Sequence, residues 1–267
     1  MEIKKYLTAL FAFFSLAALL LTGCKKDTSN STGSIQLPVV QGYLIPGTSP
    51  TVKLYQQKSL TDTAKYGAPI TGQQVYISDG STNVLLTESP AGTYTYNNPS
   101  FLVAGKTYTL QFKYLNYSVT ASTLMPAKPT NFTTAVATVE LSTTTPSTGV
   151  LDRLAWNNPD SLNHVLAFLN ADEKDFPVNS FGQSTRPYNF TINTDRSSYY
   201  NITQNIFPYL GPYTIILFSV NQEYIDLLNS NTNSATSSTL NNVPTNIVNG
   251  FGIFTAMQAD TVSLNVF

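Results

Sequence analysis

Short segments in which apolar and polar residues alternate recur along the chain from position 39 onward, separated by turn-forming residues. Segments 51–55 and 106–112 are the clearest, because each places its apolar side chains on one face of an extended chain. Asp79-Gly80 follows another such segment and predicts a hairpin turn. The strand candidates in the first half of the chain are 39–44, 51–55, 74–78, 84–87, 92–96, 106–112 and 117–120.

The density of these strands predicts a β-sandwich. About seven strands within about ninety residues are typical of immunoglobulin-like sandwiches, and a transthyretin-like sandwich has the same character. Pro126 and Pro129 then interrupt the alternation, because two prolines so close together withdraw backbone donors from a continuing strand. We therefore expect an all-β chain with an N-terminal β-sandwich over 35–125 and a second β-rich domain over 126–267.

The second half of the chain continues the β pattern and adds one short helix. Its strand candidates are 136–141, 151–156, 165–170, 188–192, 213–220 and 251–257. Ser219 and Gln222 form a capping-box-like start, apolar residues then share one helical face, and Asn229 ends the helix. The low-complexity Ser/Thr/Asn stretch 230–242 predicts a long exposed loop.

The first 23 residues have the pattern of an export signal, and a cysteine follows them. Lys4 and Lys5 precede the uncharged apolar run 7–21, and Leu21-Thr22-Gly23-Cys24 follows directly. This sequence resembles the lipobox of bacterial lipoproteins, in which the cysteine thiol is diacylated and the preceding peptide is removed. An ordinary secretory signal or a short membrane span is the alternative, but a span needs about 18 or more apolar residues. We expect a signal peptide over 1–23, lipidation of Cys24 and a flexible tether over 24–34.

Composition narrows the classes of function that the chain can have. Cys24 is the only cysteine, so a lipidated chain has no thiol left for a disulfide, a metal site or a nucleophile. The net charge of the full chain is −1, and loss of residues 1–23 makes it one unit more negative, which excludes nucleic acid as a partner. Charged residues are only 11% of the chain, against about a quarter in typical proteins, so helices with ion-paired faces are not expected.

Several segments share their order and spacing with one known family: 39–44, 73–80, 91–94, 104–110, 213–219 with 223–224, 244–247 and 250–254. Together they resemble a family of Bacteroidota lipoproteins, domain of unknown function 4249. Asn249, where the family pattern has a glycine, and Asn158, where it has an aspartate, depart from it. The resemblance implies an all-β, two-part lipoprotein outside the cytoplasm, often associated with TonB-dependent outer-membrane transporters, and it implies no catalytic residue.

Candidate catalytic groups are few. His164 is the only histidine and has Asp160 or Asp172 as potential partners, but no Gly-x-Ser-x-Gly motif accompanies it, so we interpret it as a polar histidine between a loop and a strand. The acidic cluster 172–175 lacks the glycine and the distal glutamate of a calcium loop, and is interpreted as a solvated turn. We expect no metal, no cofactor and no enzymatic activity.

Aromatic and hydroxyl side chains supply the remaining candidate sites. Tyr199, Tyr200 and Tyr209 lie in turn-rich sequence and are candidate ligand-facing aromatics for a glycan or a peptide, although most tyrosines of a sandwich fill its core. Trp156, in an alternating strand, is expected in the core. Three Asp-Ser/Thr-apolar triplets resemble the O-glycosylation acceptor of exported Bacteroidota proteins, and their hydroxyl residues are Thr63, Ser161 and Thr261.

These features predict an outer-membrane lipoprotein, anchored through Cys24, that acts as a non-catalytic accessory subunit of a TonB-dependent transporter and captures its nutrient. Lys25 follows the cysteine, and by resemblance to the proteobacterial sorting rule the absence of aspartate there permits delivery to the outer membrane. The alternatives are a stand-alone glycan- or peptide-binding lipoprotein and an envelope hydrolase. The pattern does not indicate which face of the outer membrane the protein occupies.

Overall fold

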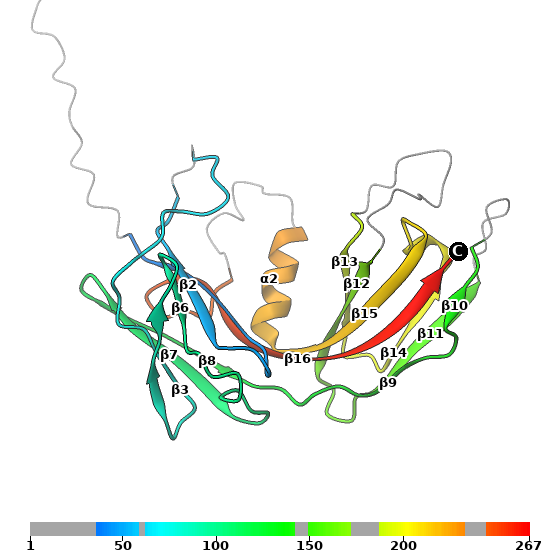
Figure 1. Ribbon diagram of the computed structural model, residues 1–267, viewed down its shortest axis with the longest axis horizontal. Helices are drawn as coiled ribbons and strands as arrows, with labels where there is room; N and C mark the ends of the chain where they lie inside the picture. Colours follow the sequence, from blue (N-terminus) through cyan, green and yellow to red (C-terminus); the bar gives the residue numbers. More distant parts are fainter. Residues whose placement is uncertain (1–35, 59–61, 142–148, 172–186, 233–243) are drawn as a thin grey trace, which may run out of the picture. The chain divides into compact units, whose positions relative to one another are not determined.

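Strand β16 (Phe251–Val266) connects the two halves of the fold in the computed structural model (Figure 1). Its first residues pair in parallel with β1 (Val39–Leu44), and the rest of it pairs antiparallel with β15 (Gly211–Val220). The structure describes residues 36–58, 62–141, 149–171, 187–232 and 244–267. The described residues between Leu37 and Phe267 belong to one compact unit.

The sheet that contains β16 has nine strands, in the order β13-β12-β15-β16-β1-β2-β6-β5, with β10 pairing separately with the end of β16. Alternating sequence accounts for β2, whose Val52 and Leu54 are fully buried while Lys53 is exposed. The bounds of the other members are β2 (Thr51–Tyr55), β5 (Thr87–Glu88), β6 (Thr93–Thr95), β10 (Thr138–Val139), β12 (Asn163–Asn170) and β13 (Phe190–Asp195).

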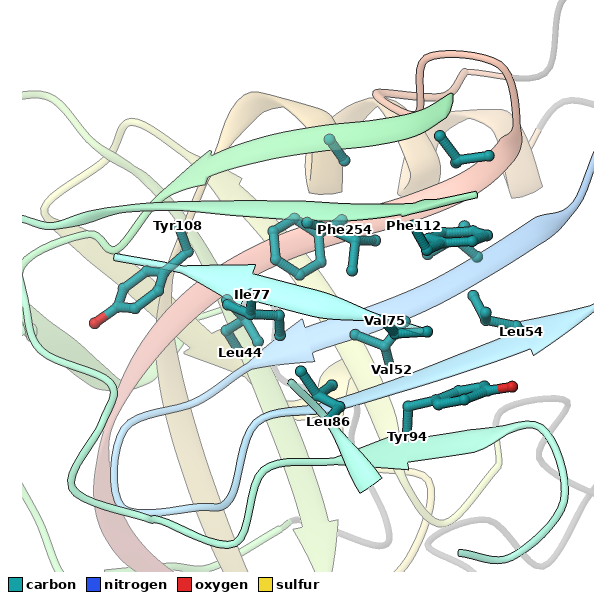
Figure 2. Close-up of a cluster of buried hydrophobic side chains, with 14 of the residues drawn as sticks. Leu44, Val52, Leu54, Val75, Ile77, Leu86, Tyr94, Tyr108, Phe112 and Phe254 are labelled. Carbon is teal, nitrogen blue, oxygen red and sulfur yellow. The ribbon is translucent and has the colours of Figure 1, made fainter. Parts of the chain in front are cut away.

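Two smaller sheets cover one face of the large sheet, and each encloses a hydrophobic core. Even-numbered residues of β16 point to that face: Phe254 and Ala256 enter the first core, and Leu264 and Val266 enter the second. Figure 2 shows Phe254 among first-core side chains from β1, β2, β3 and β7. The first cover sheet contains β3 (Tyr76–Ser78), β4 (Asn83–Leu85), β7 (Thr107–Tyr114) and β8 (Tyr117–Leu124), and the second contains β9 (Thr130–Thr134), β11 (Val150–Asn157) and β14 (Tyr199–Thr203).

Helix α2 (Gln222–Thr232) packs on the opposite face of the large sheet, over β16 (Figure 1). Its Ile225 contacts a small cluster with Val165, Val220 and Met257, and Met257 is an odd-numbered residue of β16. The helix is the one predicted from the sequence, but its predicted start at Ser219 is wrong, because β15 keeps its sheet pairing as far as Val220. Its predicted end at Asn229 is wrong too, because the helix continues to Thr232 and so includes the first residues of the expected loop 230–242. A single 3-10 turn, η2 (Gln204–Ile206), follows β14.

The predicted fold class is confirmed: the chain is mostly β, with an N-terminal sandwich and a second β-rich part that carries one helix. The strand expected at 136–141 is wrong in its bounds, since the structure has β9 before it and only β10 within it. The division at 125/126 stays a prediction. Ile247 and Phe254, which follow that division by more than a hundred residues, nevertheless lie in the first core.

Candidate functional site

A hydrogen-bonded network lies where β8, β16 and α2 meet. The hydroxyls of Thr123 and Thr255 both donate to Oε1 of Glu223, at 2.7 and 3.0 Å. The Thr123 oxygen in turn accepts from Asn221 Nδ2 at 2.9 Å and from the backbone nitrogen of Ala256 at 3.1 Å. Thr123 is 4% exposed and Thr255 is fully buried, so the network satisfies polar groups that water does not reach. It also holds the Glu223 carboxylate in a fixed position.

A pocket of about 220 Å³ opens beside that carboxylate, between the first turns of α2 and the start of β16. Asn246 fixes one wall, because its side chain accepts from the nitrogen of Phe254 and donates to the oxygen of the same residue. Two carboxylates, those of Glu223 and Asp226, give the pocket an acidic lining. Among the described residues, no group of three or more His, Cys, Asp or Glu gathers to hold a metal ion. The lining residues are Glu223, Asp226, Pro244, Thr245, Asn246, Gly252 and Ile253.

A second hollow, of about 170 Å³, lies on the outward face of β1 and β2. We call it the β1–β2 groove, and it is lined by Gln41, Tyr43, Thr51 and Lys53. The Tyr43 ring contacts the Tyr224 ring of α2 edge to face, with the ring centroids 6.3 Å apart. Burial and the neighbouring phenol groups of Tyr224 and Tyr66 raise the pKa of Tyr43, and a hydrogen bond with Gln41 opposes that effect.

His164 is the second residue of β12, which directly follows the turn 158–162, as its interpretation between a loop and a strand has it, and its side chain is only 1% exposed. Its Nδ1 lies 3.0 Å from the carbonyl oxygen of Leu162, which can only accept, and its Nε2 lies 3.1 Å from Oγ of Ser219. The neutral ring therefore donates from Nδ1 and accepts the Ser219 hydroxyl at Nε2. Burial lowers the pKa of His164, which favours this neutral form.

The Ser219–His164 pair has the hydrogen bond that joins nucleophile and base in a catalytic triad. The third member of such a triad is a carboxylate, and here the carbonyl of Leu162 takes its place. Ser219 is 1% exposed, so a substrate has no access to its hydroxyl in this conformation. Asp160 is exposed, and Asp172, together with the rest of the cluster 172–175, lies outside the described residues. The arrangement holds β12 against β15 rather than presenting a reactive group.

Trp156 is 4% exposed, as expected for a core residue. Its ring contacts Phe132 at 6.2 Å and His164 at 5.7 Å between centroids. The indole Nε1 is a buried donor with no hydrogen-bond partner among the described residues.

The structure separates the three candidate ligand-facing tyrosines. Tyr199 is 49% exposed on β14, where the Arg153 guanidinium lies 4.8 Å from its ring centroid. Arg153 also donates from Nε to Asn201 Oδ1 at 2.9 Å. Tyr200 packs against the second core, and Tyr209 is half-buried with its ring stacked at 4.1 Å on Tyr188.

The three candidate O-glycosylation residues are all exposed. Thr63 lies between β2 and β3, Ser161 lies in the turn before β12 with φ of 51°, and Thr261 points outward from β16. Cys24, the signal peptide and the tether 24–34 lie outside the described residues, as does most of the loop 230–242. Within the described part of the chain, no helix has the length and apolar character needed to cross a membrane.

At the two positions that depart from the family pattern, the asparagine can do locally what the family's residue would do. Asn158 Oδ1 accepts from the nitrogen of Leu162 at 2.8 Å, and so closes the turn before β12 as an aspartate would. Asn249 has φ of 56°, in the left-handed region that asparagine tolerates better than most residues other than glycine. Sequence reasoning missed the polar network, because its members come from segments far apart in the chain. It also missed the groove, because the alternation of β1 and β2 predicts which side chains point outward but not the hollow between them.

Comparisons with known proteins identify one family and show distant structural likenesses, including those to two chicken proteins. A sequence-family model described as domain of unknown function (DUF4249) matches residues 34–263. No curated protein is found to match the sequence. The FN1-FN3 domains of chicken CNTN1 are similar at 14% identity and a TM-score of 0.29, over 70% of this chain and 59% of that one. A two-domain fibronectin type III segment of chicken tenascin is similar at 9% identity and a TM-score of 0.26, over 86% of this chain and 99% of that one.

Proposed function

The chain belongs to the DUF4249 family, and from that premise we propose that it is a non-catalytic, lipid-anchored outer-membrane protein that captures ligand for a TonB-dependent transporter. The anchor is Cys24, which ends the lipobox-like sequence Leu21-Thr22-Gly23-Cys24. Two acyl chains, each contributing ~0.8 kcal/mol per buried CH₂, hold a protein on a membrane far more firmly than one chain does. A protein fixed in this way works on ligands and partners at the membrane surface.

One observation carries the capture role: two polar hollows flank α2 on the same face of the large sheet. The acidic pocket contains Glu223 of α2, and the β1–β2 groove contains Tyr43, which contacts Tyr224 of α2. Small polar hollows on a hydrogen-bonded framework suit recognition of a small polar ligand. The Ser219–His164 pair is buried, so we do not propose the hydrolase alternative.

A stand-alone binding protein is the second candidate, and the pair of Arg153 and Tyr199 favours it. The Arg153 guanidinium lies over the exposed Tyr199 ring and is held at Nε by Asn201, so a cation and an aromatic face stand side by side on the surface. Such a surface can bind a glycan or a peptide without a transporter.

The transporter proposal is tested by purifying the tagged full-length protein from outer membranes of the native host in mild detergent. Mass spectrometry then identifies the proteins that remain bound. Cys24→Ala is the matched control, because it removes the acylated thiol and leaves the folded residues unchanged. We expect one TonB-dependent receptor at a near-equal amount with the wild type and its loss with the variant.

Recovery of the wild-type protein in the membrane fraction with no receptor contradicts the accessory role. In that case the stand-alone binding protein becomes the working proposal. Recovery of Cys24→Ala in the same membrane fraction as the wild type contradicts the lipid anchor itself.

A further inference from the structure

The β1–β2 groove brings together side chains from two consecutive, paired strands. Gln41 and Tyr43 come from β1, and Thr51 and Lys53 come from β2, because alternate residues of both strands point away from the first core. In the sheet, Gln41 lies directly beside Lys53. Tyr224 of α2 contacts one lining residue, because its ring lies edge to face against the ring of Tyr43. The groove therefore lies on paired strands, and one of its side chains is supported by the helix.

Two further aromatic rings, those of Tyr55 and Tyr66, lie near the β1–β2 groove. Tyr55, the last residue of β2, stacks on Tyr66 with ring centroids 5.0 Å apart and an angle of 10° between the ring planes. Tyr66 is 47% exposed, and its phenol lies close enough to Tyr43 to contribute to the raised pKa of that residue. Flat aromatic faces beside hydroxyl and amide groups match the apolar faces and the hydroxyls of a sugar ring.

The lining of the β1–β2 groove carries a positive charge. Lys53 lines the groove and is exposed, and the Lys65 ammonium lies 5.3 Å from the centroid of the Tyr66 ring. None of the four lining residues is acidic. Glu223, which precedes Tyr224, directs Oε1 to the hydroxyls of Thr123 and Thr255. A negatively charged group would thus meet a lysine ammonium without a competing carboxylate in the lining.

We propose that the β1–β2 groove binds an anionic saccharide, with Lys53 contacting its carboxylate or phosphate and Gln41 and Thr51 contacting its hydroxyls. This inference rests on the ligand-capture role proposed above and specifies its ligand. The volume of about 170 Å³ is below the roughly 300–1,000 Å³ of pockets for drug-sized molecules, so the groove holds one sugar unit and not an oligosaccharide.

Isothermal titration calorimetry on the full-length protein in mild detergent tests the proposal with three probes: galacturonic acid, glucose 6-phosphate and glucose. We expect at least one of the two anionic sugars to bind at least tenfold more tightly than glucose, and added salt to weaken that binding. Galacturonic acid binding without glucose 6-phosphate binding would identify a carboxylate ligand, and the reverse would identify a phosphate ligand.

Two variants locate the site, and a matched variant controls for general loss of charge. Lys53→Gln and Tyr66→Ala change exposed residues, so both should fold, and each should weaken binding of the anionic sugar about tenfold or more. Lys113→Gln removes an exposed lysine from β7 of the same sandwich and should leave binding unchanged.

Equal binding of glucose and the anionic sugars, or no binding of any probe, overturns the proposal. An equal loss with Lys53→Gln and Lys113→Gln overturns it as well, because the charge effect would then not belong to the groove. Recovery of a receptor in the membrane pull-down is independent of all these results, so failure of the groove and failure of the transporter role are distinguishable.

Discussion

His164 shows how one buried residue makes stability depend on pH. The imidazole has an ordinary pKa of about 6.5 in an unfolded chain, and burial lowers the pKa of His164 in the folded protein. Between these two pKa values the unfolded chain binds more protons than the folded one. The contribution of His164 to the free energy of unfolding is therefore fully present above about pH 6.5, and it is lost as the pH is lowered toward the pKa of the folded state.

We expect urea unfolding at pH 7.5, 6.5 and 5.5 to give a free energy of unfolding that decreases with acidification. His164→Gln should make this decrease smaller, because the amide can still donate toward Leu162 and accept from Ser219 but does not titrate. An unchanged slope in the variant would show that other groups cause the pH dependence.

Single residues of the candidate sites were partly predictable. Alternation in 51–55 is enough to place Lys53 outward, and alternation in 151–156 is enough to place Trp156 in the core. Tyr199 and Tyr200 are adjacent and identical, so composition could not distinguish the exposed ring from the packed one. The strand register decides this, because neighbouring residues of β14 point to opposite faces of its sheet.

At the scale of elements, the pairing of β1 with β16 depends on Gly252. Gly252 has φ of 95°, and a Cβ atom there would lie 2.0 Å from the carbonyl oxygen of Val40. Gly252→Ala combines backbone strain of about 1–3 kcal/mol with this steric conflict, so we expect it to lower the free energy of unfolding by more than about 3 kcal/mol.

Gly105→Ala is the matched control for Gly252→Ala. Gly105 has φ of 77°, but no atom lies within 4 Å of a Cβ built there, so the control measures strain alone. Chemical denaturation of the two variants should show a clearly larger loss for Gly252→Ala. Equal losses would mean that the approach of β1 to β16 relaxes at little cost.

The element pattern was predictable wherever side chains alternate strictly. The predicted bounds of β1 and β2 match the structure. Strand β14 was missed, because Ser197-Ser198 before it and polar residues within it indicate a turn, whereas pairing with β11 fixes an extended chain. The second half of β16 was missed for a related reason: it faces solvent at Thr261 and Ser263, and only its pairing with β15 shows that the strand continues.

At the scale of the whole molecule, the network around Thr123 ties the first sandwich to α2 and to the strand that enters both cores. Thr123→Val keeps the shape of the side chain but leaves Glu223, Asn221 and the Ala256 nitrogen without their hydroxyl partner. Leaving such groups unsatisfied costs about 1–3 kcal/mol, and we expect a loss of this size in urea unfolding.

Thr109→Val is the control, because Thr109 is exposed on β7 and removal of its hydroxyl should change stability little. Both variants should be followed by two probes, Trp156 fluorescence for the second core and far-ultraviolet circular dichroism for the whole chain. A Thr123→Val protein as stable as Thr109→Val would show that water replaces the hydroxyl without cost.

Strand β16 is sixteen residues long and follows in sequence every strand with which it pairs. Neither core is complete until it is in place, because it supplies Phe254 to the first and Leu264 to the second. A chain that emerges in order from a ribosome or a translocation channel therefore cannot complete the fold of its first half before β16 has emerged. Both halves of the fold are thus completed together, after β16 has emerged.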